Sequence, residues 1–125
     1  MLMPPGIRVY LVTQPVDLRG SFYSLSRYVR GILGAEPREG GLYVFLGRGG
    51  NLVKVLFWDR SGYCIFAKRL ERGRFKLPSD LPPDLTRHEV DFATLTLLLE
   101  GIDIAGATRR PAFTAPVFGA NRSNS

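Results

Sequence analysis

The sequence contains very little of the residue types on which disulfide-stabilised proteins and many enzymes rely. Among its 125 residues there is one cysteine, Cys64, and one histidine, His88. A lone cysteine excludes an intramolecular disulfide and favours a reducing location, which we expect to be the cytoplasm. Cys64 lies in an apolar run without a histidine neighbour. We therefore expect a buried, inert thiol and not a nucleophile.

Long apolar segments are missing as well. No run of apolar residues approaches the ~20 that a membrane-spanning helix needs. The first six residues, MLMPPG, have neither the cationic region nor the apolar stretch of a signal peptide. We therefore expect neither a membrane partner nor export.

Residues suited to a catalytic or metal site are also scarce. His88 is expected in the first turn of a helix, in a surface or capping role, and no metal-ligand spacing is present. Gly47–Gly50 lacks the GxxxxGK[ST] pattern of a phosphate loop. The acidic residues weighed for a metal-dependent nuclease each have a local role as a cap, a turn, a salt-bridge partner or a helix end: Asp17, Asp59, Glu71 and Asp103. The sequence thus predicts a protein that is not an enzyme and that needs no metal or cofactor.

What the sequence has in excess is positive charge, and it is unevenly spread. The net charge is +6, from 17 basic and 11 acidic residues. Residues 1–66 contain 8 basic and 4 acidic residues, and residues 67–76 contain 5 basic and 1 acidic. These ten residues therefore carry the same excess of +4 as the 66 before them. A strip of this density is typical of a surface that binds a polyanion such as DNA or RNA.

The N-terminal third has the pattern of a strand followed by an amphipathic helix. Ile7–Val12 is rich in β-branched and apolar residues, which predicts a strand. Asp17 is suited to cap the helix that follows, and Gly34 and Pro37 are suited to end it. The predicted buried stripe of this helix follows the helical repeat and consists of Phe22, Leu25, Val29, Ile32 and Leu33.

The middle of the chain predicts consecutive strands joined by short turns. The strands are expected at Leu42–Leu46, Leu52–Trp58 and Tyr63–Leu70, with a brief fifth one at Arg74–Leu77. The hairpin that ends at Gly62 favours a left-handed backbone at that glycine. Because short connections force neighbouring strands to be antiparallel, the pattern indicates a meander.

The C-terminal third predicts one more helix and a tail. Thr86 and Glu89 have the spacing of a capping box, and a buried stripe follows at Phe92, Leu95, Leu99 and Ile102. Residues 105–125 lose this periodicity, so we expect a disordered tail after a single domain over residues 1–104. The predicted fold class is α+β: a small antiparallel β-meander sheet of four to five strands with two helices packed on it.

The basic strip is the strongest functional signal, because Lys and Arg on a rigid sheet edge can meet phosphates and release counterions. Its opposing interpretation is a set of solubilising charges that protects a sheet edge from aggregation. Lys54 interrupts an apolar strand, so it lies either on the solvent face or at a site. The candidate DNA-binding residues are Lys54, Lys68, Arg69, Arg72, Arg74 and Lys76, with Arg48 and Arg60 as further contributors.

Several separated blocks of the sequence resemble the insertion-sequence-66 accessory transposition proteins, the Orf2-like or TnpB group. The resemblance covers roughly residues 4 to 104. Its blocks, in chain order, are PVDLR from Pro15, LYVF from Leu42, KVLFWD from Lys54, GY at Gly62, KRLERGRF from Lys68 and LLEGID from Leu98. The hairpin sequence Asp59-Arg60-Ser61-Gly62 departs from the pattern by adding a positive charge.

This resemblance implies a bacterial protein of DNA recombination that supports transposition beside a separate transposase and has no established catalytic residues. Two hypotheses follow. In the first, the protein binds transposon DNA through the basic strip. In the second, it is a protein–protein adaptor for the transposase or another protein of the same element, without direct contact to DNA.

Overall fold

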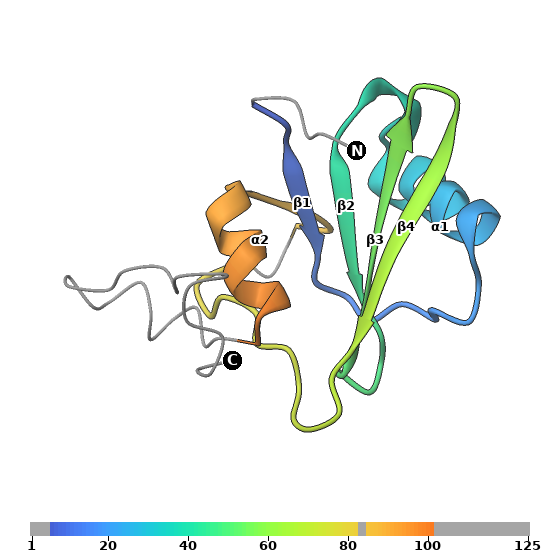
Figure 1. The fold of residues 1–125 in the computed structure, drawn as a ribbon. Coiled ribbons are helices and arrows are strands. Elements are labelled where there is room, and N and C mark those ends of the chain that lie inside the picture. The colour runs from blue at the N-terminus through green and yellow to red at the C-terminus, as the bar shows by residue number, and fades with distance from the viewer. Residues whose placement is uncertain (1–5, 83–84, 102–125) are drawn as a thin grey trace, which may run out of the picture.

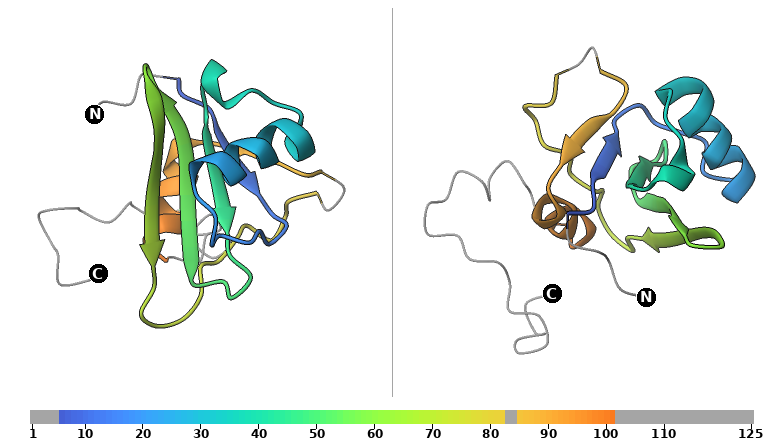
Figure 2. Two further views of the ribbon diagram at one scale, coloured as in Figure 1. Left: turned by 90° about the vertical axis from the view of Figure 1, so that its right-hand side faces the viewer. Right: turned by 90° about the horizontal axis from the view of Figure 1, so that it is seen from above.

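The computed structural model describes residues 6–82 and 85–101, which form one five-stranded sheet with helices on both faces (Figures 1 and 2). The strands are β1 Val9–Val12, β2 Leu42–Leu46, β3 Leu52–Asp59, β4 Gly62–Arg69 and β5 His88–Val90. The helices are α1 Phe22–Tyr28, its π-helical continuation η1 Val29–Leu33, the 3₁₀ turn η2 Pro37–Glu39, and α2 Phe92–Leu99.

The sheet is mixed, so the α+β class is confirmed but the prediction of an all-antiparallel sheet is wrong. The strand order is β4-β3-β2-β1-β5. β2, β3 and β4 pair antiparallel through short turns, as predicted, and β5 pairs antiparallel with β1. β1 and β2, however, pair in parallel. The connection between them contains α1 and η1, and a crossover of that length allows the chain to return in the same direction.

One face of the sheet is covered by α1 and η1. Leu25, Val29 and Leu33 of the predicted stripe are buried against residues of β2 and β3 such as Phe45. Phe22 and Ile32 are instead 46% and 56% exposed, contrary to the prediction. Phe22 is the first helical residue, and the wider turn of the π-helical segment rotates Ile32 off the stripe.

The other face is covered by α2. Leu95 and Leu98 pack against side chains of the central strands, and Phe75, from the segment after β4, completes this layer. The residues of the sheet that are buried here are Val9, Leu11, Leu42, Val44, Val53 and Val55. Because both faces are covered, β2 is buried along nearly its whole length.

The start of α2 differs from the prediction. The stretch His88–Val90, assigned above to a helix with a capping box at Thr86, is strand β5. This stretch pairs with the free edge of β1. His88 is therefore buried and not at the surface, and its Nε2 lies 3.4 Å from Thr13 Oγ1. The true N-cap of α2 is Asp91, which accepts a hydrogen bond from the Thr94 N–H at 2.8 Å.

Three smaller predictions are also wrong. Asp17 does not cap α1, whose N-cap is Ser21. In the β3–β4 hairpin the left-handed residue is Arg60, with φ 56°, and not Gly62. Residues 74–77 form an extended loop and not a strand, because they pack against the β2–β3 turn and the core below α2 instead of pairing with a strand.

The predicted burial of Cys64 is confirmed only in part, and two predictions concern residues that the structure does not describe. Cys64 is half-buried in β4. The proposed tail, residues 105–125, and Ile102 lie outside the described residues.

Candidate nucleic-acid interface

The basic strip forms a loop that is anchored against the β2–β3 turn at one end of the sheet (Figure 1). The Leu70 N–H donates to the Asn51 carbonyl and the Phe75 N–H donates to the Gly50 carbonyl, both at 2.8 Å. Phe75 is only 5% exposed and belongs to the core beneath α2. The strip is therefore held at both of its ends and by an apolar side chain between its basic residues.

Five cationic side chains are exposed at the end of β4, on the loop that follows it and on the neighbouring turn. They are Arg48, Arg69, Arg72, Arg74 and Lys76, and we call them the basic end. Within the described residues, none of them forms an ion pair with a carboxylate. Their charges are consequently available to a ligand.

The close approach of the strip to the turn depends on Gly50. Its backbone has φ +80°, and a Cβ added there would lie 3.1 Å from Arg74 Cδ. The aliphatic part of Arg74 therefore lies directly over the glycine, while the residue as a whole stays exposed. This contact fixes the side chain near its base and leaves its guanidinium in solvent.

Lys54 and Lys68, the other two predicted site residues, use their ammonium groups inside the fold. Lys54 Nζ donates to the carbonyls of Leu18 and Gly20, at 2.8 and 3.0 Å. Lys68 Nζ donates to the carbonyl of Leu99 at 2.7 Å, at the C-terminus of α2, where a positive charge is favoured. Lys54 thus holds the loop before α1, and Lys68 holds α2 to the edge strand.

The loop held by Lys54 lies at the same end of the sheet as the basic end. The Val16 N–H donates to the Leu46 carbonyl at 3.1 Å, and Arg19 forms a bidentate pair with Asp17. These hydrogen bonds from Arg19 lower the pKa of Asp17 to about 2, and the charge of Arg48 adds to the effect. Arg19, although exposed, therefore has its charge compensated.

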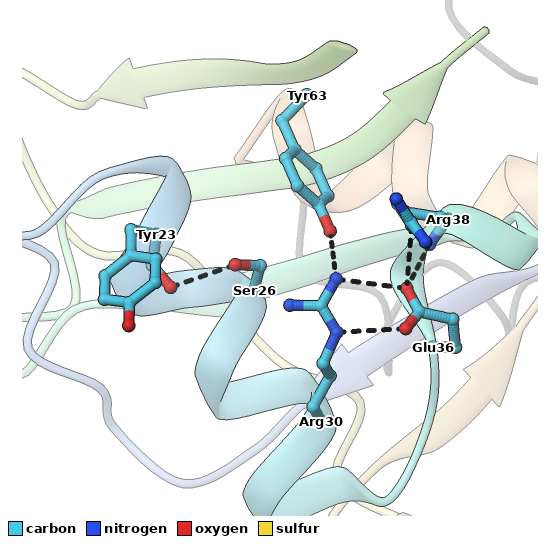
Figure 3. Close-up of polar contacts among 6 residues, drawn as sticks. All are labelled: Tyr23, Ser26, Arg30, Glu36, Arg38 and Tyr63. Atoms are coloured by element: carbon cyan, nitrogen blue, oxygen red, sulfur yellow. Dashed lines mark hydrogen bonds and ion pairs between the residues drawn. The ribbon is translucent and has the colours of Figure 1, made fainter. Parts of the chain in front are cut away.

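The opposite end of the sheet has its charges largely paired. Arg30 forms a bidentate pair with Glu36, at 3.0 and 3.2 Å, and donates to the Tyr63 hydroxyl at 2.6 Å (Figure 3). Glu36 also accepts from the Arg38 N–H, and the hydrogen bonds from Arg30 lower its pKa. The β3–β4 hairpin lies at this end, so Arg60 is not brought together with the basic strip.

A shallow groove of about 1620 Å³ lies at this opposite end. It is lined by charges of both signs, among them Arg8, Arg87 and Glu39, and by the stacked rings of Tyr10 and Tyr43. Arg87 lies over Tyr10, 5.0 Å from the ring centre. Because the groove mixes acidic and basic side chains, it lacks the strong positive excess of residues 67–76.

In the part of the chain that the structure describes, no group of three or more His, Cys, Asp or Glu side chains is placed to hold a metal ion. No helix in the same part is long and apolar enough to cross a membrane.

Comparison with known proteins decides the family. The family model for the IS66 Orf2 like protein matches residues 7–109. The chain belongs to the IS66 Orf2 like protein family. Two proteins of Sinorhizobium fredii (strain NBRC 101917 / NGR234) are similar to it. The uncharacterized protein y4hO is 41% identical over 104 residues, which cover 82% of this chain and 88% of y4hO.

The second similar protein, the uncharacterized protein y4jC, is 32% identical over 106 residues, which cover 85% of this chain and 88% of y4jC. No solved structure matches this Orf2-like chain. The resemblance drawn from the sequence blocks is confirmed, and the protein is an accessory protein associated with transposition.

The structure also relates the blocks of this Orf2-like sequence to one another. The PVDLR loop, Lys54 and the KRLERGRF strip all meet at one end of the sheet. The strip was predictable from charge density. The turn that carries Arg48 has only this one charge, and its hydrogen bonds to the strip place it beside the other cations.

Proposed function

We propose that this protein is a non-catalytic accessory factor that supports transposition of an insertion-sequence-66-type element by binding the element's DNA through the basic end. One observation carries the proposal. Five exposed cations, unpaired within the described residues, are gathered on two segments that are hydrogen-bonded to each other. The proposed partners are the transposon DNA and the transposase encoded beside it.

The proposal rests on the difference between the two ends of the sheet. Phosphates of a duplex attract exposed, uncompensated Lys and Arg side chains, and the release of counterions supplies most of the affinity. At the opposite end, Arg30 and Glu36 already neutralise each other. Of the candidate residues, Lys54 and Lys68 contribute in this scheme by holding the neighbouring loop and α2, because their ammonium groups bind backbone carbonyls.

The test is a salt titration of duplex DNA binding with the purified protein. If all five cations of the basic end contact phosphates, the logarithm of the association constant falls with the logarithm of the salt concentration with a slope of about −4 to −5. The double variant Arg72→Ala/Arg74→Ala is expected to bind more weakly and to have a slope smaller by about 2.

The matched control removes two arginines from the opposite end, Arg8→Ala/Arg60→Ala. It changes the net charge by the same amount, so an effect of overall charge alone would weaken both variants equally. Equal weakening would contradict a local interface. The absence of any DNA retention at ~50 mM salt, where several phosphate contacts still hold, would rule out DNA binding itself.

A second candidate function is the adaptor without DNA contact, and exposed aromatic side chains favour it. Tyr23 on α1 is 73% exposed, and Phe92 on α2 is 49% exposed. Aromatic residues are enriched in the centres of protein interfaces. Capture of the transposase that persists after nuclease treatment and is lost in Tyr23→Ala would support this function, whereas loss of capture on nuclease treatment would indicate bridging by DNA.

A further inference from the structure

Strand β4 is a long edge strand that no described element covers. It is the outermost strand on one side of the sheet and pairs only with β3 (Figure 2). Its pairing with β3 is continuous from Gly62 to Arg69, without a bulge. The other edge strand, β5, has only three residues, and such short edges offer little to a second chain.

The hairpin and one further contact determine which residues of β4 form backbone hydrogen bonds with β3. In a hairpin with a two-residue loop, the residues next to the loop, here Asp59 and Gly62, bond to each other, and bonded pairs then alternate with non-bonded pairs. The hydrogen bond from the Leu70 N–H to the Asn51 carbonyl fits the same alternation, because Leu70 lies eight residues after Gly62. The even-numbered residues of β4 therefore bond to β3, and the odd-numbered ones point their backbone groups outward. The outward set is Tyr63, Ile65, Ala67 and Arg69.

The usual protections of an edge are almost absent here. β4 contains no proline, and its two charged residues, Lys68 and Arg69, lie at its C-terminal end. Lys68 is held by the Leu99 carbonyl, and among residues 6–82 and 85–101 Arg69 forms no ion pair. At the centre lies Phe66, which is 46% exposed on the face of the sheet covered by α2. An edge with these properties is a template for another strand.

The edge is also complementary to itself. The four outward-pointing residues lie symmetrically about Phe66. A two-fold axis through Phe66 therefore pairs Ile65 with Ala67 of a second copy, and Tyr63 with Arg69 of that copy, as antiparallel hydrogen-bonded pairs. Phe66 then faces Phe66 of the second copy at a non-bonded position, where side chains approach most closely and aromatic pairs stabilise a sheet.

This register also separates the like charges. The two Arg69 side chains lie six residues apart along the strands, a distance of about 20 Å. This exceeds the Debye length of about 8 Å at physiological ionic strength, so their repulsion is screened. A register shifted by two residues toward the C-terminus places Arg69 opposite Ile65 and Phe66 opposite Lys68, and loses the aromatic pair.

We propose that β4 is a dimerisation edge that takes a second copy of this chain, in antiparallel register about Phe66, to form a continuous ten-stranded sheet. This inference does not rest on DNA binding, because the pairing is made by the backbone of the edge strand, to which Arg69 alone of the basic end belongs.

Measurement of mass in solution tests the association. The expected mass is twice the 13.9 kDa of the chain at chain concentrations up to about 500 µM, a range that detects weak association. Ala67→Pro removes an outward-pointing N–H and places a ring at the edge, without touching the bonds to β3. Since the two-fold axis applies the change twice, dimerisation is expected to weaken at least about tenfold.

Ala67→Val is the matched control, because it keeps the N–H and is expected to dimerise like the unaltered chain. A circular dichroism spectrum of Ala67→Pro that matches the parent shows that the variant folds. A monomer at every concentration, or a dimer that Ala67→Pro leaves unchanged, would overturn the proposal.

Cross-linking tests the register independently of any effect on folding. In a Cys64→Ser background, Phe66→Cys brings two cysteines into a non-bonded pair with Cα atoms about 4.5 Å apart, within the reach of a disulfide. Arg69→Cys in the same background places them about 20 Å apart. Mild oxidation is expected to give a covalent dimer for the first variant only. Equal cross-linking of both would contradict this register.

Discussion

Lys54 illustrates how a single charged residue in an apolar strand can belong to the fold. It lies on β3, half-buried, and its ammonium group bridges the carbonyls of Leu18 and Gly20. Two backbone acceptors in the loop before α1 therefore depend on one side chain. This position is neither plainly on the solvent face nor plainly at a ligand site, the two alternatives that the sequence offered.

Replacement of Lys54 by methionine is therefore expected to destabilise the protein. Met keeps most of the aliphatic length but leaves the two carbonyls without their donor, which costs about 1–3 kcal/mol of the free energy of unfolding. Urea denaturation measures this loss. Lys76→Met, at an exposed position of the basic end, serves as the control and is expected to change stability by less than about 0.5 kcal/mol. A Lys54→Met protein of unchanged stability but reduced salt dependence of DNA binding would instead make Lys54 a phosphate contact.

The Asp17–Arg19 pair gives a prediction about pH. Hydrogen bonds from Arg19 lower the pKa of Asp17 to about 2. Because the pKa of the folded state lies below that of the unfolded chain, about 3.9, the pair stabilises the fold above about pH 4, and this contribution disappears as the pH falls through about 2. Carboxyl chemical shifts followed by NMR are expected to place the Asp17 midpoint near 2.

Arg19→Ala removes the cause of this shift, so the pKa of Asp17 is expected to return toward its ordinary value. Arg27→Ala is the control, because the Arg27 guanidinium lies over the ring of Tyr23 and makes no contact with Asp17. An Asp17 midpoint that stays near 2 in Arg19→Ala would show that another group, such as Arg48, controls the carboxyl.

Among the elements, α2 has two candidate N-caps, Thr86 from the sequence pattern and Asp91 from the structure. The capping-box spacing favours Thr86 as the N-cap, whereas the structure places Asp91 there, with its carboxylate on the Thr94 N–H. Asp91→Ala is therefore expected to lower the free energy of unfolding by about 1 kcal/mol. Thr86→Ala, at an exposed position outside the helix, is expected to change it by less than about 0.5 kcal/mol. Urea denaturation of both variants distinguishes the assignments, and the reverse order of effects would restore the capping box.

The elements that the sequence predicted well are those whose partners are close in the chain. β2, β3 and β4 pair through short turns, so the alternation of apolar residues and the glycine-rich turn define them locally. β5 is three residues long and is a strand only because β1 has a free edge beside it. Nothing within residues 88–90 carries that information, and the same stretch has a good helical pattern.

In the candidate site too, the features that depend on local sequence were predictable, and those that depend on tertiary contacts were not. The exposure of Arg69, Arg72, Arg74 and Lys76 agrees with what their charge density predicted. The internal contacts of Lys54 and Lys68 were not predictable, because their acceptors are carbonyls at the end of α2 and in the loop before α1. Those carbonyls become available only once the tertiary fold places them near the lysines.

In the whole molecule, dimerisation through β4 would determine where the two basic ends lie. The two-fold axis through Phe66 relates antiparallel strands, so the basic ends of two copies lie at opposite ends of the ten-stranded sheet. Each basic end begins at Arg69, and the two Arg69 residues lie six residues apart along the strands, a distance of about 20 Å. Two basic ends so far apart and facing away from each other are expected to bind two separate duplexes.

The dimer is therefore expected to bridge DNA. A biotinylated duplex on beads should retain a second, fluorescent duplex in the presence of the protein, and added salt should release it. Ala67→Pro should still bind a single duplex but retain much less of the second one, because each monomer offers one basic end. Arg72→Ala/Arg74→Ala should lose both activities together. Undiminished bridging by Ala67→Pro would mean that each chain has a second DNA-binding surface, for which Arg8 and Arg60 at the opposite end of the sheet are the first residues to substitute.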